Sequence, residues 1–318
     1  MKSLAFLVAA GLALLSAPAL AQSPPIDDVE ATVVQELVVR ARLPGPAWWK
    51  VSDADSTVYV LGMPDALPKG LAWDQSVLAR RLQGADRVIT PPVVQVGAGV
   101  RDVPALYGLY RRANNTGRRL DAALPPALNA RFGAAALRAG KGADEYQTML
   151  PWLAGVRLAD AFRERVGLDD EEPLKAVRRA AKRAKVKTEP ALVLKDRAVP
   201  LARALSALPD TVGVACLEDA VEAVEGGDGA LRRAAAGWAV GDVATALTSP
   251  RTGDRCLAAI PGAGALKREA LAKQASAIEA ALGRRGHTVA VLSLRSLVAQ
   301  GGVLDQLRSR GHAVQTPE

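Results

Sequence analysis

Apolar and polar positions divide the chain into two β-prone ends and a helical middle. Near the N-terminus, the sequence "AWWKVSDADSTVYVLG" has two β-prone runs on either side of a polar turn at residues 53–55, a pattern typical of a hairpin. A third run, residues 87–90, is stopped by Pro91 and Pro92, and a fourth begins at His287. The pattern therefore predicts strands close to both ends of the chain.

Between residues 103 and 285 the apolar positions recur instead at spacings of three and four. Ala, Leu and Arg dominate segments such as "EEPLKAVRRAAKRAKV" and "ALKREALAKQASAIEAAL", and this spacing predicts helices. The C-terminal part then reads as a strand, a helix and a short last strand. We therefore predict an α/β fold of α+β-like character. Strands from both chain ends form a central mixed sheet in it, and the middle is a large helical region.

Two of the predicted strands are followed by similar loops. The segments "STVYVLGMPDAL" and "HTVAVLSLRSLV" each place an apolar strand before a loop, and Gly62 is free to take a positive φ where the first strand stops. Loops that follow neighbouring strands of an α/β sheet meet at one edge, where such proteins usually have their sites. The two loops are therefore expected to lie side by side.

The first 21 residues have the composition of a secretory signal peptide. Lys2 precedes an apolar run that ends in small residues, which predicts cleavage after Ala21. The run is short and interrupted by Gly and Pro, so neither it nor any later segment is expected to span a membrane. We expect residues 22–46 to be a flexible tether and residues 47–318 to be a single domain, in a protein that is periplasmic or secreted.

The charge balance is consistent with an envelope location. The 318 residues include 41 Lys and Arg against 33 Asp and Glu, a formal net charge of +8 at pH 7, which suits a compartment rich in anionic lipid and acidic polysaccharide. An exported protein rarely meets nucleic acid, so none is expected as a partner. Two interpretations remain open for the densest basic run: it is a helix face that only contacts water, or it contacts an anionic surface. The run consists of Lys175, Arg178, Arg179, Lys182 and Arg183.

Cys216 and Cys256 are the only cysteines in the chain. An even number of cysteines in an exported protein favours a disulfide. The bond would close a loop of 40 residues and contribute roughly 3 to 4 kcal/mol by the chain-entropy relation. Two buried free thiols are the alternative.

Several short motifs occur in an order that resembles one protein family. They include an aromatic-Lys-Val run at Trp49, the strand "STVYVLG" with a Leu-Pro pair and Trp73 after it, "LPWL", "GWAVGDV" and the C-terminal "LVAQGGVLDQLRSRGHAV". With its motifs in this order, the chain resembles the TraB/GumN family (TraB/PrgY/GumN), which includes the Tiki-type metalloproteases. The resemblance extends from about residue 47 to residue 316. The resemblance implies a TraB/GumN/Tiki-like fold with metal ligands at the ends of its strands.

The chain departs from the family pattern at the positions that would hold the metal. The first family His aligns with Asp65, the family Glu with Pro91 and the C-terminal His with Ser296. Ser293 replaces a family Gly, and the two His residues of the chain occupy no family ligand position. A transition metal needs imidazole and carboxylate groups that converge on one point. We therefore expect these positions to be vestigial, with no metal, no cofactor and no catalytic residue.

Two hypotheses for the function follow. In the first, the protein is non-catalytic and binds an unknown envelope ligand, a polysaccharide or a peptide, through the vestigial cleft or the basic face. In the second, it is a divergent metal-dependent hydrolase or protease of the TraB/GumN/Tiki type, with a replacement site at Asp65, Ser293 and Ser296. The candidate ligand-binding residues are Gly62, Asp65, Ser293, Arg295 and Ser296.

The N-terminal segment suggests one further partner. The stretch "VQELVVRA", which begins at Val34 and ends at Ala41, resembles the boxes through which outer-membrane receptors contact TonB. An extended stretch of this kind suits strand addition at the edge of a partner's sheet. An ordinary edge strand of the same domain is the alternative.

Overall fold

The computed structural model describes residues 43–169, 171–251 and 253–317. The predicted signal peptide and most of the predicted tether, including the stretch from Val34 to Ala41, lie outside the described residues. Gly45 and Pro46 at the end of that tether are buried, and a Cβ on Gly45 would lie 2.5 Å from the backbone oxygen of Asp74. The packed part of the chain therefore begins just before the predicted boundary at residue 47.

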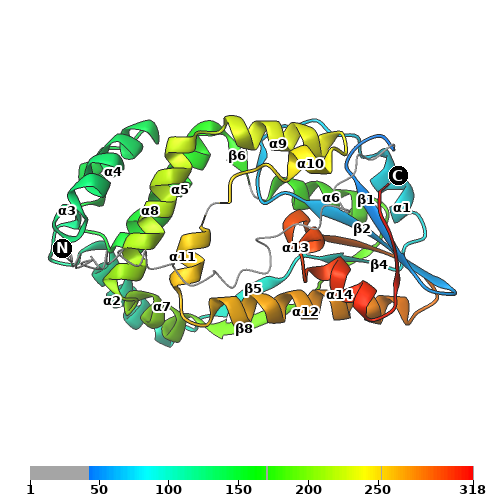
Figure 1. Cartoon of the computed structure of the whole chain (residues 1–318). Helices are drawn as coiled ribbons and strands as arrows, with labels where there is room; N and C mark the ends of the chain where they lie inside the picture. The colour runs from blue at the N-terminus through cyan, green and yellow to red at the C-terminus, as the bar shows by residue number, and fades with distance from the viewer. Residues whose placement is uncertain (1–42, 170, 252, 318) are drawn as a thin grey trace, which may run out of the picture.

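A six-stranded mixed sheet forms the centre of one half of the molecule (Figure 1). In spatial order its strands are β10 (Ala313–Gln315), β1 (Trp48–Ser52), β2 (Ser56–Met63), β9 (Gly286–Ser293), β4 (Arg87–Thr90) and β7 (Lys187–Pro190). β1 and β2 form the predicted antiparallel hairpin, whereas β2, β9 and β4 run parallel to one another. Strands from both chain ends therefore meet in one sheet, as predicted.

The edge strand β7 comes from the middle of the chain instead of from either end. Its sequence, Lys-Thr-Glu-Pro, is polar, and its residues are exposed or half-buried. It pairs in parallel with β4 at the margin of the sheet, where charged side chains and a Pro are tolerated. The prediction of a helical middle region missed this strand because an exposed edge strand has no apolar alternation to reveal it.

Helices cover the sheet and build the other half of the molecule. In Figure 1, α12 and α14 lie on one side of the sheet, and α6, α9 and α10 lie on the other. Among the helices of the described ranges, none is both long and apolar enough to cross a membrane. The helices are α1 (Ser76–Leu82), α2 (Val103–Asn114), α3 (Leu120–Ala123), α4 (Pro126–Arg138), α5 (Pro151–Val166), α6 (Glu172–Arg183), α7 (Ala198–Ser206), α8 (Asp210–Gly226), α9 (Gly229–Ala239), α10 (Val243–Ala246), α11 (Asp254–Ala259), α12 (Ala263–Leu282), α13 (Leu294–Val298) and α14 (Val303–Ser309).

Two further strand pairs lie outside the main sheet. β3 (Leu67–Pro68) pairs in antiparallel fashion with β6 (Leu168–Asp169), and β5 (Val93–Gly97) pairs in parallel with β8 (Val193–Arg197). The β3–β6 pair joins the loop that follows β2 to the end of α5. It therefore links the sheet to the helical half of the molecule.

The buried apolar residues form two separate clusters. The first surrounds the sheet and includes Trp49 and Leu292. The second lies among α3, α4, α5 and α8 and contains the fully buried Phe132 and Leu217. α5 and α8 approach so closely that a Cβ on Gly155 would lie 2.9 Å from the Cα of Leu217. Each half of the molecule therefore has its own core.

The conformation and role of Gly62 differ from those predicted from the sequence. The expectation of a strand stop with a positive φ was wrong, because β2 continues through Met63 and Gly62 is absent from the described residues with positive φ. A Cβ on Gly62 would lie 2.6 Å from Cδ1 of Leu294 and 3.2 Å from the ring of Trp49. A glycine is needed here because α13 packs directly against the strand.

Candidate functional site

The loops that follow β2 and β9 lie side by side, as expected from the sequence. In the parallel pair, Gly62 is opposite Leu292 and Met63 is opposite Ser293. The Ser293 hydroxyl donates a hydrogen bond to Oδ1 of Asp65 at 3.3 Å. Two of the sequence-based candidates, Asp65 and Ser293, are therefore in contact at the carboxyl edge of the sheet, the edge at which α/β proteins usually bind ligands.

A tryptophan from the motif "GWAVGDV" fixes the end of β2. The indole Nε1 of Trp238 donates a hydrogen bond to the backbone oxygen of Gly62 at 2.7 Å, and the contact is buried. The Trp238 ring packs edge to face against Trp73, with ring centroids 5.2 Å apart. Since neutral hydrogen bonds gain strength away from water, this contact holds the strand end and the loop with Asp65 in place.

Arg295 and Ser296 lie in the first turn of the short helix α13 and have structural contacts. Arg295 donates through Nη2 to the backbone oxygens of Leu247 and Ser249, the former at 2.9 Å, and to the Ser249 hydroxyl at 3.1 Å. Ser296 is buried, and its backbone oxygen would lie 2.6 Å from a Cβ on Gly302. Arg295 therefore ties α13 to the segment that follows α10.

Pro91 lies apart from the other candidate positions. It directly follows β4, and β9 lies between β4 and β2 in the sheet. The backbone oxygen of the preceding Thr90 accepts from the backbone N–H of Ala191, which continues the pairing with β7. The structure therefore brings Asp65 and Ser293 together and leaves Pro91 on the far side of β9.

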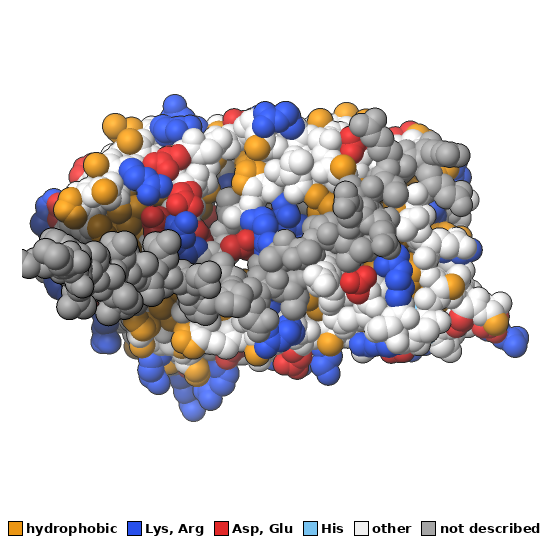
Figure 2. All heavy atoms as spheres, viewed as in Figure 1, with side chains coloured by type: hydrophobic (Ala, Val, Ile, Leu, Met, Phe, Trp, Pro, Cys, Tyr) orange, Lys and Arg blue, Asp and Glu red, His pale blue; other side chains and the backbone are white. Residues whose placement is uncertain are grey.

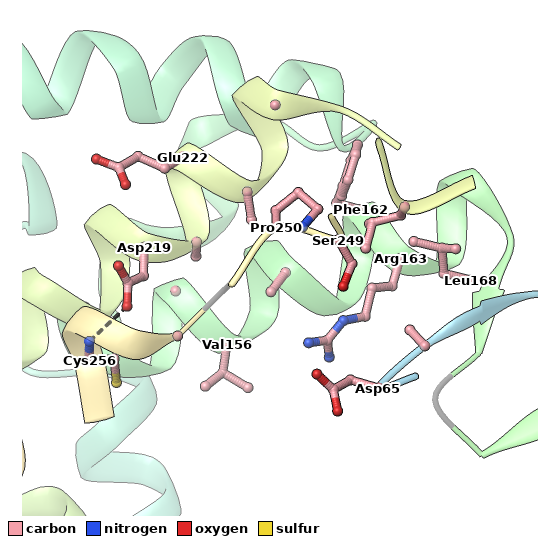
Figure 3. A pocket seen from close by; sticks show the side chains of 18 of the residues that line it. Asp65, Val156, Phe162, Arg163, Leu168, Asp219, Glu222, Ser249, Pro250 and Cys256 are labelled. Atoms are coloured by element: carbon pink, nitrogen blue, oxygen red, sulfur yellow. Dashed lines mark hydrogen bonds between the residues drawn. The ribbon is translucent and has the colours of Figure 1, made fainter. Parts of the chain in front are cut away.

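A cavity of about 390 Å³ lies next to Asp65, between α5, α8 and α9. We call it the interhelical cavity; Figure 3 shows it from close by. Of the sequence-based candidates for ligand binding, only Asp65 lines it. Most of the other lining residues belong to helices, and in the sequence these look like ordinary helical positions, while the rest come from loops and from β6. The lining side chains that the helices contribute include Val156, Ala159, Phe162, Arg163, Ala220, Ala223, Leu231 and Ala234.

Charged side chains lie at two ends of the interhelical cavity. At one end Arg163 points toward Asp65, and Ser249 lies nearby (Figure 3). At the other end Asp219 accepts a hydrogen bond from the backbone N–H of Cys256 at 2.7 Å. Burial raises the pKa of the Asp219 carboxyl, and the Cys256 N–H opposes this effect. Apolar side chains occupy the wall between the two ends.

The acidic residues of α8 are neutralised by arginines from neighbouring elements. Arg131 on α4 pairs with Glu225 at 2.7 Å, and Arg255 on α11 pairs with Glu218 and Glu222, each at 3.0 Å. The hydrogen bond from Arg131, with the positive charges of Arg131 and Arg138, holds the pKa of Glu225 below its usual range. Figure 2 shows acidic and basic side chains gathered over α8 and α11. The acidic cluster is therefore part of an ion-pair network.

The predicted disulfide is present, and it forms part of the cavity wall. Cys216 on α8 and Cys256 on α11 are bonded, with their Cα atoms 4.2 Å apart. Both residues line the interhelical cavity. The bond therefore fixes α11 against α8 beside Asp219.

The residues present do not fit the transition-metal site that the family resemblance implies. Within the described ranges, no group of three or more His, Cys, Asp or Glu side chains converges as a metal site would require. His287 lies opposite Thr57, near the start of β2, and Nε2 of His312 is 3.1 Å from Glu279. Neither histidine is near Asp65, which lies beyond the other end of β2.

The family comparison agrees with the motifs. The sequence model of the TraB/PrgY/gumN family matches residues 47–316 of the chain. No curated protein and no solved structure matches the chain. The family match spans the hairpin, the helical middle and the last strand of the sheet. The chain therefore belongs to the TraB/PrgY/gumN family.

Proposed function

We propose that this protein is an exported, non-catalytic member of the family that binds an envelope ligand in the interhelical cavity. One observation carries the proposal. The cavity lies beside Asp65 at the carboxyl edge of the parallel strands, yet the described residues near it include no convergent metal-binding group. A cavity of this size is typical of a small-molecule site. In this proposal, the protein keeps a binding site where the family has its metal site, and other residues replace the family's metal ligands.

The contacts of Asp65 support a binding role over a catalytic one. Its carboxylate accepts a hydrogen bond from Ser293, and the guanidinium of Arg163 points toward it. An activated serine needs a general base that is itself held by a third group. Neither His287 nor His312 is placed to act as that base. Ser293 therefore serves to hold Asp65.

The divergent hydrolase is the second candidate function. The observation in its favour is the contact between the Ser293 hydroxyl and the Asp65 carboxylate, 3.3 Å, at the edge of a cavity. A carboxylate in contact with a hydroxyl is an element of many hydrolytic sites. In this function Asp65 would have to bind a cation or activate a water.

The basic face of α6 is a second route to an envelope ligand within the first function. Arg178, Lys182 and Arg183 are exposed there, while Lys175 is paired with Asp169 at 3.1 Å. A row of exposed cations attracts anionic polysaccharide or lipid, and this attraction weakens as salt rises. We place the specific site in the interhelical cavity because it is concave and lined largely by apolar side chains, whereas the basic face is an exposed helix surface.

Metal titration separates the two functions. Purified mature protein would be titrated with Mn²⁺, Co²⁺ and Zn²⁺ in a calorimeter, alongside the variant Asp65→Ala. For the non-catalytic function we expect no stoichiometric binding of any of the three ions to either protein. Stoichiometric binding with a micromolar or lower dissociation constant, lost in Asp65→Ala, would refute this function and establish the metal-dependent alternative.

A further inference from the structure

The walls of the interhelical cavity are apolar over most of their area. α5 contributes Val156, Ala159 and Phe162, and the segments beyond it contribute Leu168 and Pro250. α8 and α9 add four alanines, whose small side chains leave the space open, and α8 also adds the acidic Asp219 and Glu222. Phe162 and Leu168 are buried, whereas Val156 remains 49% exposed. The exposed part of Val156 adds apolar surface that an apolar ligand in the cavity would remove from water.

Arg163 is the cation that faces this apolar space. Its closest ion-pair partner is Asp160 on the same helix, at 3.6 Å, and its side chain is 45% exposed. Figure 3 shows its guanidinium at the same end of the cavity as Ser249 and Asp65. Asp65 already accepts a hydrogen bond from Ser293. The single contact of Nη1 with Asp160 leaves other N–H groups of the planar guanidinium available for a carboxylate, which it can bind with two parallel hydrogen bonds.

We propose that the interhelical cavity binds an amphiphile with one acyl chain and a carboxylate head. The chain lies between α5, α8 and α9, and the head lies at Arg163 with the Ser249 hydroxyl beside it. This inference rests on the proposed function and names the chemical class of its ligand. It favours a lipid-like molecule over the polysaccharide or peptide expected from the sequence.

A sugar would be a poor fit for the apolar wall. Each sugar hydroxyl that leaves water needs a hydrogen-bond partner, and an unpaired one costs about 1 to 3 kcal/mol. The lining side chains include Val156, Phe162 and Pro250, which have no polar atoms to offer. A methylene chain loses nothing at such a wall and gains the free energy of leaving water.

The first experiment tests the chain. The mature protein would be titrated with dodecanoate below its micelle concentration, by calorimetry and by displacement of a fluorescent fatty-acid analogue. We expect saturable binding at one site. Ala223→Phe on α8 places a ring in the cavity and should abolish binding. The matched control is Ala236→Phe on α9, an exposed position that does not line the cavity, where binding should be unchanged.

The second experiment tests the head. Arg163→Gln removes the charge and should weaken dodecanoate binding about tenfold, the loss expected for one charge-assisted hydrogen-bonded pair. Binding of 1-dodecanol, which has the same chain and no charge, should change much less. Arg157→Gln, the same substitution at an exposed position of α5 outside the cavity, should leave both ligands unaffected.

Each outcome decides between the alternatives. Absence of saturable dodecanoate binding, or binding that Ala223→Phe does not alter, would overturn the inference. If dodecanoate fails but a soluble glycan or peptide binds and is blocked by Ala223→Phe, the proposed function stands and the amphiphile is wrong. Stoichiometric metal binding through Asp65 would refute the non-catalytic function whatever the result with dodecanoate.

Discussion

At the scale of single residues, Arg81 is held in an unusual environment. Its guanidinium carbon lies 4.6 Å from the ring centre of Trp48 and 4.2 Å from that of Tyr59. Its Nη1 is buried and has no hydrogen-bond partner among the described residues. Burial lowers the pKa of Arg81 to about 10. The two aromatic contacts therefore offset only part of the cost of removing this cation from water.

Replacing Arg81 with a neutral chain of similar shape should stabilise the fold. Arg81→Met keeps the contacts with both rings and removes the buried donor, so we expect the free energy of unfolding to rise by about 1 kcal/mol. Arg80→Met, at the exposed neighbouring position, should change it by less than about 0.5 kcal/mol. Urea unfolding of the three proteins measures the difference. A loss of stability in Arg81→Met would mean that the cation contributes more than its burial costs.

Asp219 gives a prediction about pH. Because burial raises its pKa in the folded protein, the folded state holds the proton more tightly than the unfolded state. The stability that this residue contributes is therefore complete below its unfolded pKa of about 3.9 and is lost as pH rises through the raised folded pKa. Asp219→Asn keeps an acceptor for the Cys256 N–H and does not ionise.

Comparing Asp219→Asn with the parent protein separates the contribution of Asp219 to the pH dependence of stability from the contributions of the other carboxyl groups. The stability of the variant relative to the parent should increase between about pH 4 and pH 7. Unfolding curves at four pH values across this range provide the test. A difference that stays constant with pH would show that the carboxyl of Asp219 has the same pKa in the folded and unfolded chains.

At the scale of the elements, the crossing of α5 and α8 depends on one glycine. A Cβ on Gly155 would lie 2.9 Å from the Cα of Leu217 and 3.0 Å from the backbone oxygen of Cys216. Gly155→Ala should push the helices apart and lower the free energy of unfolding by about 2 kcal/mol. Gly133→Ala in α4, where a Cβ meets nothing within 4 Å, should instead raise it by about 0.5 to 1 kcal/mol. Equal effects of the two substitutions on thermal unfolding would contradict the close crossing.

The elements also differ in how well the sequence predicted them. β1, β2, β4 and β9 are apolar strands in the sheet, and their aromatic and β-branched residues were sufficient to locate them. β7 is a polar edge strand whose partner, β4, lies far away in the sequence, so its formation depends on a tertiary contact. The role of Gly62 was also missed, because the approach of α13 is a property of the packed structure.

At the scale of the whole molecule, the ligand-binding space lies between segments that are distant in sequence. Asp65 follows a strand of the sheet, Arg163 belongs to α5 and Ser249 follows α10. Asp65 was predicted as a candidate because a motif marks its loop. Arg163 and the small residues around it had no such signal, since alanines at helical spacing are more often simple packing positions. The cavity could be found only after the two halves were placed together.

The disulfide connects these halves of the molecule. It joins α8, in the helical core, to α11, which leads into the helix α12 that covers the sheet. Closing a loop of 40 residues should stabilise the folded protein by about 3 to 4 kcal/mol. The double variant Cys216→Ala, Cys256→Ala should therefore unfold at lower urea concentration, and added reductant should change its stability no further.

Loss of the disulfide should also affect the interhelical cavity, because both cysteines line it. Without the bond, α11 is held to α8 by the Asp219 contact with the Cys256 N–H and by the pairs of Arg255 with Glu218 and Glu222. Such exposed pairs contribute about 0 to 1 kcal/mol each and weaken in salt. Dodecanoate binding to the double variant should therefore fall as salt is raised, while binding to the oxidised parent should change less. An equal response of the two proteins would show that the ion pairs alone keep α11 in position.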